Sequence, residues 1–172
     1  DDLRLVVFAR YAAEQSIESA TAVAGGFAML RDQVGAATPG SSLAAAAVEE
    51  TLRFESSQIS WRRVTTRPTT LGGVDLPAGT RVFLNFASAN HQPDLFEHPD
   101  TFDIHRANAH RHISFGKGIH FCVGAPLSRL EARLAFPALL SLPGLRLAQD
   151  DVRWAESITH RGLESLEVRF DA

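Results

Sequence analysis

A single cysteine, Cys122, is present among the 172 residues of the chain. One cysteine excludes an internal disulfide framework and suits a reducing compartment. Long hydrophobic runs are also missing, since the longest, Ala22 to Leu30, is far shorter than the roughly 20 residues that span a bilayer. No secretory signal is visible. We therefore expect a cytoplasmic protein that does not cross a membrane.

An excess of charge of one sign is lacking too. Lys and Arg number 17 against 20 Asp and Glu, which leaves a net charge of -3 and argues against a strongly basic nucleic-acid binder. Hydrophobic residues make up 45% and charged residues 22% of the chain, a mix that excludes wholesale disorder and fibrous architectures. The length allows one domain or part of a larger one. Because the chain opens with Asp1 rather than Met, we expect a processed protein or a fragment.

Helical patterns occur in three segments. Small and apolar residues at three- and four-residue steps predict a helix over residues 3–31, weakened in its second half by two glycines. Strong helix formers after a Pro-Gly-Ser-Ser break predict a second helix from about Leu43 to Phe54. A third is predicted from about Gly124 to Leu142. Its apolar residues on one face are Leu127, Leu130, Leu134, Ala138 and Leu142.

Short strands rich in β-branched and aromatic residues are predicted over Ile59 to Val64, Thr69 to Leu71, Arg81 to Phe86 and Leu166 to Phe170. Between Ala87 and Phe121 there is little periodicity, and ordered loops of this length are uncommon in compact domains and usually functional. The predicted fold class is therefore α+β and mostly helical, with a small antiparallel sheet and one long structured loop.

The strongest functional signal is the segment from Phe115 to Gly124, which reads Phe-Gly-Lys-Gly-Ile-His-Phe-Cys-Val-Gly. Its glycines let the backbone approach a flat ligand, and the N-terminus of the helix that follows stabilises a thiolate. A lone cysteine is more often a small buried hydrophobe. However, this spacing of phenylalanine, glycine, histidine and cysteine arises by chance on the order of once in 10⁸ positions. We therefore interpret Cys122 as a thiolate metal ligand.

This segment closely resembles the haem-binding loop of the cytochrome P450 family, whose cysteine thiolate is the proximal ligand of the haem iron. Two further motifs precede it in the family's order. Glu50-Thr51-Leu52-Arg53 matches the Glu-x-x-Arg helix motif, which alone would be a weak signal, and Pro99 to Arg106 matches the segment that leads into the haem loop. The resemblance covers nearly the whole chain. It implies that residues 1–172 are the C-terminal, haem-binding part of a single P450 domain whose N-terminal half is absent.

The resemblance also implies roles for individual residues. Glu50 and Arg53 would form a structural ion pair that locks the long loop against the proximal face of the haem. The family often has a basic residue where this chain has Thr101, so Arg106 is the candidate for the third partner. Arg63 and His120 would bind the haem propionates, although nearby arginines leave a surface role open for Arg63. The residues expected to contact the haem or its thiolate are Cys122, Phe115, Gly116 and Gly124.

The first predicted helix corresponds to the family's long central helix, which crosses the distal face of the haem. Aligned without gaps from Glu50, its acid–alcohol motif falls on Glu14, Gln15 and Ser16. Glu14 keeps the acid, Gln15 replaces the usual threonine and Ser16 follows, whereas a two-residue shift puts Ile17 at the threonine position. The proton relay would then be altered, with Ser16, a water or the substrate as the donor. Alternatively, Glu14 and Gln15 are only helix formers on a partly exposed face.

The function that the resemblance implies is that of a bacterial haem-thiolate monooxygenase. It would use haem b to insert oxygen into, or oxidatively couple, a small organic substrate of secondary metabolism. Electrons would come from NAD(P)H through a ferredoxin reductase and a ferredoxin. The missing N-terminal half or a second copy would be a further partner. The alternative is a non-catalytic accessory or scaffold protein, which the altered threonine position and the short chain favour and the complete cysteine loop opposes.

Five histidines in the long loop raise the separate possibility of a zinc site. Their spacing fits neither the helical His-Glu-x-x-His pattern nor a zinc finger. We therefore expect them to be solvated loop residues rather than metal ligands. They are His91, His98, His105, His110 and His112.

Overall fold

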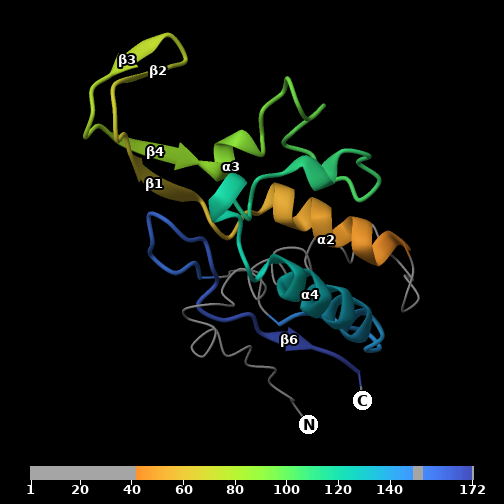
Figure 1. The fold of residues 1–172 in the computed structure, drawn as a ribbon. Coiled ribbons are helices and arrows are strands. Elements are labelled where there is room, and N and C mark those ends of the chain that lie inside the picture. Colours follow the sequence, from red (N-terminus) through yellow and green to blue (C-terminus); the bar gives the residue numbers. More distant parts are fainter. Residues whose placement is uncertain (1–41, 149–152, 172) are drawn as a thin grey trace.

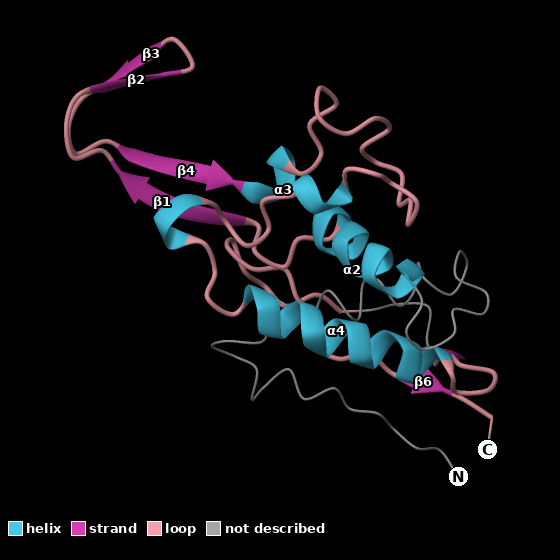
Figure 2. Ribbon diagram, turned by 45° about the vertical axis from the view of Figure 1, so that its right-hand side comes forward, coloured by secondary structure: helices cyan, strands magenta, loops and turns pink. Residues whose placement is uncertain are grey.

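The computed structural model describes residues 42–148 and 153–171, so the helix expected over residues 3–31 lies outside the described part. Two helices, α2 and α4, run side by side, and short strands and loops surround them (Figures 1 and 2). The elements are α2 (Ser42–Phe54), β1 (Ser60–Val64), β2 (Thr69–Leu71), β3 (Val74–Leu76), β4 (Arg81–Asn85), α3 (Phe86–Ala89), α4 (Ala125–Leu140), β5 (Arg146–Leu147) and β6 (Val168–Arg169), with 3₁₀ turns at Ala109–Arg111 and Gly118–His120.

Helix α2 forms where the sequence predicts it. Its first turns consist of leucine and alanines, which lose little side-chain entropy in a helix. Ala44, Ala47, Val48 and Leu52 recur at three- and four-residue steps and are buried. The small alanines allow close approach to neighbouring elements. The polar residues of its C-terminal half are then available for the buried ion pairs described below.

Helix α4 is also confirmed, but it buries a different face from the leucine stripe. Leu127, Leu130 and Leu134 are more than half exposed, at 59%, 54% and 66%. The face against α2 carries smaller residues and one aromatic ring, namely Ala125, Ser128, Ala132 and Phe136. A close helix–helix contact requires small residues at the crossing, so the leucines lie outside it.

In the described part of the chain, the strands form three small two-stranded antiparallel ladders. Strand β1 pairs with β4, with Trp61 opposite Leu84 and Arg63 opposite Val82. Strand β2 pairs with β3 across the Gly72-Gly73 turn, where both glycines have positive φ values of 56° and 81°. This hairpin lies at the far tip of the β1–β4 ladder, away from α2 and α4 (Figures 1 and 2). Strand β5 pairs with β6.

Several predicted boundaries differ from the structure. Ile59, predicted as the first residue of a strand, lies just before β1. Phe86, predicted as the last residue of a strand, instead begins α3. The Asn85 side chain caps this helical turn by accepting a hydrogen bond from Ser88 N. The strand expected over residues 166–170 is reduced to Val168–Arg169. The long loop is not without structure, since it contains α3 and both 3₁₀ turns. The α+β class is confirmed.

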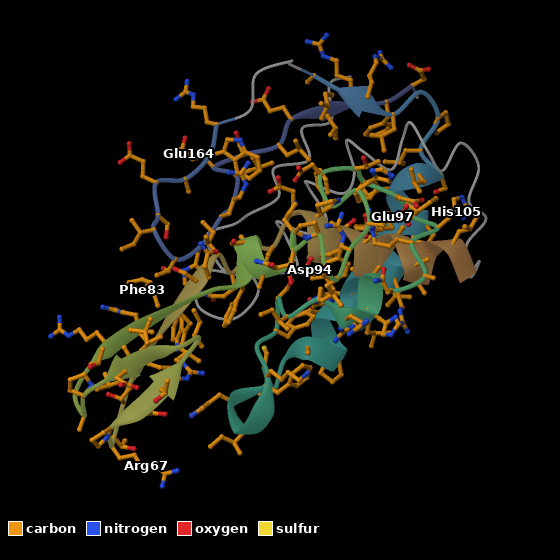
Figure 3. All side chains as sticks on the ribbon, turned by 90° about the horizontal axis from the view of Figure 1, so that it is seen from above. Arg67, Phe83, Asp94, Glu97, His105 and Glu164 are labelled. Atoms are coloured by element: carbon orange, nitrogen blue, oxygen red, sulfur yellow. The ribbon has the colours of Figure 1, made fainter. Side chains whose placement is uncertain are left out.

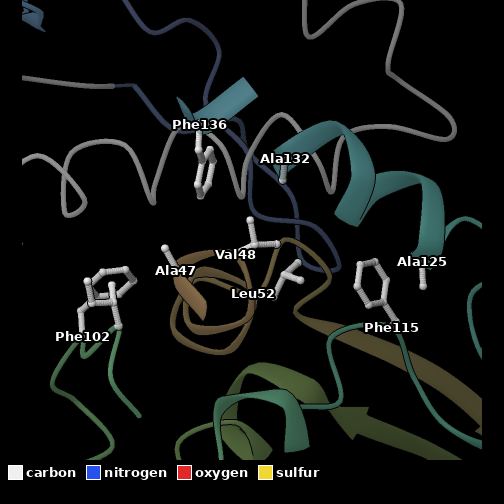
Figure 4. Close-up of a cluster of buried hydrophobic side chains, with 9 residues drawn as sticks. Ala47, Val48, Leu52, Phe102, Phe115, Ala125, Ala132 and Phe136 are labelled. Atoms are coloured by element: carbon white, nitrogen blue, oxygen red, sulfur yellow. The ribbon is translucent and has the colours of Figure 1, made fainter. Parts of the chain in front are cut away.

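The main core lies between α2, α4 and the loops that cross them. It contains Phe102 from the long loop, Phe115 from the segment before Cys122, and Phe136 from α4 (Figure 4). Cys122 itself packs against the edge of this cluster. The cysteine loop is therefore built directly on the core. Within residues 42–148 and 153–171, no helix is both long and apolar enough to cross a membrane.

Candidate functional site

The loop that presents Cys122 is held by its own backbone. Gly116 and Gly118 have φ values of 72° and 76°, which side chains with a Cβ rarely adopt. The turn brings Cys122 N to 2.9 Å from the carbonyl oxygen of Phe115, to which it donates a hydrogen bond. Helix α4 begins three residues after Cys122, and its first residue, Ala125, donates its N–H to the Cys122 carbonyl oxygen at 3.3 Å. The positive end of the helix dipole is therefore next to the cysteine and favours an anion there. The positive φ values explain why the sequence has glycine at positions 116 and 118 of this turn.

The surface around the Cys122 thiol suits a flat apolar group that carries a metal. The thiol is free and half-buried, and a Cβ at Gly124 would lie 3.7 Å from the sulfur, so the glycine keeps that space open. Ile119, Phe121 and Val123 are exposed at 97%, 51% and 95%, which is unusual for residues beside a core. A cysteine thiolate is one of the proximal ligands that haem iron accepts, and apolar surface around it suits the flat porphyrin. The residues present therefore fit the haem that the resemblance implies.

The cations expected at the propionates have no acidic partner among the described residues. Arg63 is half-buried on β1, and its Nη1 donates to the neighbouring Arg62 carbonyl at 2.9 Å. His120 is exposed at the end of the 3₁₀ turn before Cys122. Both side chains are thus available to an anionic ligand.

Glu50, Arg53 and Arg106 form one buried ion-pair cluster. Arg53 Nε and Nη2 donate to the two Glu50 oxygens at 2.8 Å each, and both side chains are fully buried. Arg106 Nε donates to Glu50 Oε1 at 3.1 Å, as does the backbone N–H of Asp103 at 2.9 Å. Thr101 takes part through its carbonyl oxygen, which accepts from both arginines. A basic side chain at position 101 is therefore not needed to complete the cluster.

Asn90 connects this cluster to the cysteine loop, a role that the sequence analysis missed. Arg53 Nη1 donates to the carbonyl oxygen of Asn90 at 3.0 Å. The buried Asn90 side chain donates to Ser114 Oγ at 2.8 Å and accepts from Ile113 N at 2.8 Å. Ser114 Oγ in turn donates to the carbonyl oxygen of Leu52 at 2.6 Å. No sequence signal marks Asn90, because asparagine after a helical turn is ordinary turn chemistry.

A second buried cluster, also missed, consists of Glu49, His112 and Arg129. Arg129 Nε and Nη2 donate to the Glu49 carboxylate at 2.7 and 3.0 Å, and His112 Nε2 lies 3.2 Å from Glu49 Oε2. In the sequence, nothing distinguishes Glu49 from the adjacent Glu50. The distances show that the two acids serve separate clusters on different sides of α2.

The prediction that the loop histidines are solvated is therefore wrong for His112. Its side chain is only 1% exposed because it packs beside Glu49. His91 is half-buried, with Nδ1 3.0 Å from the Ala87 carbonyl oxygen. His98, His105 and His110 are exposed, and His105 is labelled in Figure 3. Among the described residues, no three His, Cys, Asp or Glu side chains group together as a metal site would require. The positions expected at the distal motif, Glu14, Gln15 and Ser16, lie outside the described residues.

The Glu49 carboxyl has an unusual acidity. Burial by itself would raise the pKa of Glu49, but hydrogen bonds from His112 and Arg129 outweigh it and lower the pKa from 4.5 to about 2. A carboxyl whose pKa is lowered by folding adds stability above its unfolded pKa and loses that contribution as the pH falls through its folded pKa.

We therefore expect Glu49→Gln to lower the free energy of unfolding above about pH 4.5, with the loss shrinking as the pH falls toward 2. Urea unfolding of both proteins at a series of pH values measures the difference. A difference that stays constant across this window would contradict the role of the Glu49 charge.

Comparisons with known proteins agree with this geometry. The family profile described as "Cytochrome P450" matches residues 42–158. The chain is 46% identical over 142 residues to Cytochrome P450 107B1 of Saccharopolyspora erythraea, covering 80% of this chain and 35% of that protein. It is 45% identical over 128 residues to the polyketide biosynthesis cytochrome P450 PksS of Bacillus subtilis, covering 72% of this chain and 31% of that protein. The chain thus spans about a third of these relatives.

Solved structures show the same similarity. P450BioI in complex with an acyl carrier protein ligated to hexadec-9Z-enoic acid aligns with a TM-score of 0.83 at 36% identity, covering 90% of this chain and 41% of that chain. The tirandamycin C-bound P450 monooxygenase TamI aligns with a TM-score of 0.82 at 41% identity, covering 92% of this chain and 40% of that chain. With its cysteine loop, its Glu50–Arg53 pair and more than half of its length matched, the chain belongs to the cytochrome P450 family.

Proposed function

We propose that residues 1–172 are the C-terminal, haem-binding part of a bacterial haem-thiolate monooxygenase, and that Cys122 is the proximal ligand of haem b. The observation that carries this proposal is the half-buried Cys122 thiol, set in a turn closed by the Cys122 N–H···O=C Phe115 hydrogen bond and bordered by exposed apolar side chains. A cysteine retained only for packing needs neither the glycine turn nor the open apolar surface.

The residues around Cys122 have separate roles in binding haem. The N-terminus of α4 stabilises the negative charge on sulfur, and the Phe115 carbonyl fixes the backbone of the cysteine. The exposed apolar side chains of Ile119, Phe121 and Val123 would lie against the porphyrin and exclude water from the sulfur when haem is bound. Haem bound through a thiolate supplies oxygen activation, because the thiolate increases electron density at iron and favours O–O cleavage.

Arg63 and His120 complete the proposal as propionate ligands. A charge-assisted hydrogen bond contributes about 1.5–3 kcal/mol, so Arg63→Gln is expected to weaken haem binding roughly tenfold or more. Haem titration of the protein without haem measures this change. Arg67→Gln, on the exposed turn before β2, is the matched control and should leave the affinity unchanged. Equal affinities for the Arg63 and Arg67 variants would contradict the role of Arg63.

The names of the relatives support the proposed substrate class. PksS is named for polyketide biosynthesis, TamI was solved with tirandamycin C and P450BioI with an acyl-loaded carrier protein. By this similarity we assign a small organic molecule of bacterial secondary metabolism as the substrate. Electrons pass from NAD(P)H through a ferredoxin reductase and a ferredoxin, and the protein works in the cytoplasm. Glu14, Gln15 and Ser16 are assigned to the distal motif, with Glu14 as its acid and with Ser16, a water or the substrate as the proton donor in place of the usual threonine.

The test uses the native protein, with whatever sequence flanks these 172 residues. One haem per chain and, after reduction and CO addition, the absorption band of thiolate-ligated haem are expected. Oxidation of an organic test compound with peroxide as the oxidant then distinguishes an enzyme from a scaffold. Haem binding without the thiolate-type band would overturn the assignment of Cys122. A thiolate-type band without any peroxide-driven oxidation would favour the scaffold alternative.

A further inference from the structure

One carboxylate on α2 binds the chain on both sides of the cysteine loop. His112 lies ten residues before Cys122, and Arg129 lies seven residues after it on α4. Both contact Glu49, His112 through Nε2 at 3.2 Å and Arg129 through Nε and Nη2 at 2.7 and 3.0 Å. A single side chain that belongs to neither end of the loop therefore contacts both ends.

The hydrogen bonds to Glu49 fix the orientation of its partners. The two-point bond between Arg129 and the carboxylate fixes the orientation of both groups as well as their distance. Ser114 N donates to His112 Nδ1 at 3.1 Å, so the ring proton lies on Nε2 and is donated to Glu49. The side chains of Glu49 and His112 are 14% and 1% exposed, so water competes weakly for these bonds.

The cluster is connected to Cys122 through Phe115. The guanidinium of Arg129 stacks over the Phe115 ring at 4.7 Å, and the His112 ring lies 6.0 Å from it. The carbonyl oxygen of Phe115 accepts the hydrogen bond from Cys122 N. A shift of Arg129 or His112 therefore reaches the residue that holds the cysteine backbone. Figure 4 shows Phe115 beside Ala125, the first residue of α4.

We propose that Glu49 is a positioning residue for the Cys122 thiolate, acting through His112, Arg129 and Phe115. The proposal rests on the proposed function, because it assumes that Cys122 ligates haem. It assigns to Glu49 a role different from that of Glu50, whose partners Arg53 and Arg106 hold the long loop. Residues that orient a metal ligand from behind it typically change metal affinity or activity 10- to 100-fold when replaced.

The experiment compares Glu49→Gln and Arg129→Lys with Glu55→Gln in the haem-loaded native protein. Glu55 is the matched control because it also pairs with an arginine, Arg161 at 2.6 Å, and lies just past the end of α2 without contacting the cysteine loop. Three quantities are measured: the rate of haem transfer to an acceptor protein, the fraction of the CO complex with the thiolate-type band, and the free energy of unfolding.

Glu49→Gln is expected to increase the rate of haem loss roughly tenfold and to lower the thiolate-type fraction, whereas Glu55→Gln leaves both unchanged. Arg129→Lys keeps the charge but loses the two-point bond, so it should shift both quantities in the same direction by less. If Glu49→Gln yields no folded protein, Arg129→Lys decides the question.

An unchanged rate of haem loss and an unchanged thiolate-type fraction in the folded variants would overturn the proposal, even if the free energy of unfolding falls. Such a result would leave Glu49 as a purely structural residue. A wild-type protein without the thiolate-type band would instead refute the proposed function, so the two failures are distinguishable.

Discussion

Replacing Cys122 with serine is expected to abolish the thiolate-type absorption band of the reduced, CO-treated protein completely. These 172 residues contain no other cysteine, so no second thiolate within them can take its place. A serine hydroxyl has the size of the thiol but does not ionise at neutral pH, and it is a poor ligand for haem iron. Because the hydrogen bond from residue 122 N to the Phe115 carbonyl involves only backbone atoms, the turn itself should survive the substitution.

Cys122→His is the companion variant, because imidazole binds haem iron without a thiolate. It is expected to retain haem while its CO complex absorbs at the wavelength of nitrogen-ligated haem. Circular dichroism of both variants should match that of the wild type, which separates loss of the ligand from loss of the fold. A thiolate-type band that persists in Cys122→Ser would show that the iron is ligated elsewhere.

Replacing Arg53 with methionine is expected to lower the free energy of unfolding by about 3–5 kcal/mol, a large part of the stability of a typical domain. All five N–H groups of the guanidinium are used, by the two Glu50 oxygens and by the carbonyl oxygens of Asn90, Pro99 and Thr101. Methionine fills much of the volume but leaves these buried acceptors without their donors. Glu50 keeps its hydrogen bonds from Arg106 and from the Asp103 backbone.

Arg53→Lys tests whether the geometry of the guanidinium matters as well as its charge. Lysine has three donors and no planar fork, so it is expected to recover only part of the loss. Arg146→Lys, in the exposed pair with Asp171, is the control and should change the free energy of unfolding by no more than about 1 kcal/mol. Urea unfolding measures all three variants. A loss for Arg53→Met as small as that of the control would contradict a structural role for the cluster.

Local sequence was enough to predict those elements whose stability is local. The alanine-rich start of α2 depends on backbone preferences that a few neighbouring residues determine. The glycines near Cys122 also have positive φ values that few other residues adopt. These features could be assigned without knowing what packs against them.

Long-range partners could not be assigned in the same way. Glu49 and Glu50 are adjacent in sequence and chemically identical, yet one contacts residues 63 and 80 positions away and the other contacts a residue 56 positions away. His112 stands among histidines that are mostly exposed, and only its packing beside Glu49 distinguishes it. Likewise, the leucine stripe on α4 predicts a buried face, whereas the contact with α2 uses alanine, serine and phenylalanine.

The sequence by itself therefore determined helices α2 and α4, the α+β class and the cysteine loop, because each depends on a short, ordered set of residue types. Only the tertiary structure decided which acid pairs with which arginine, how Thr101 takes part through its carbonyl, and that Glu49 contacts both sides of Cys122. The physical reason is that buried charges and hydrogen bonds are satisfied by whatever donors the fold brings within about 3 Å. That proximity is a property of the whole packed chain and leaves no pattern in the sequence around any one residue.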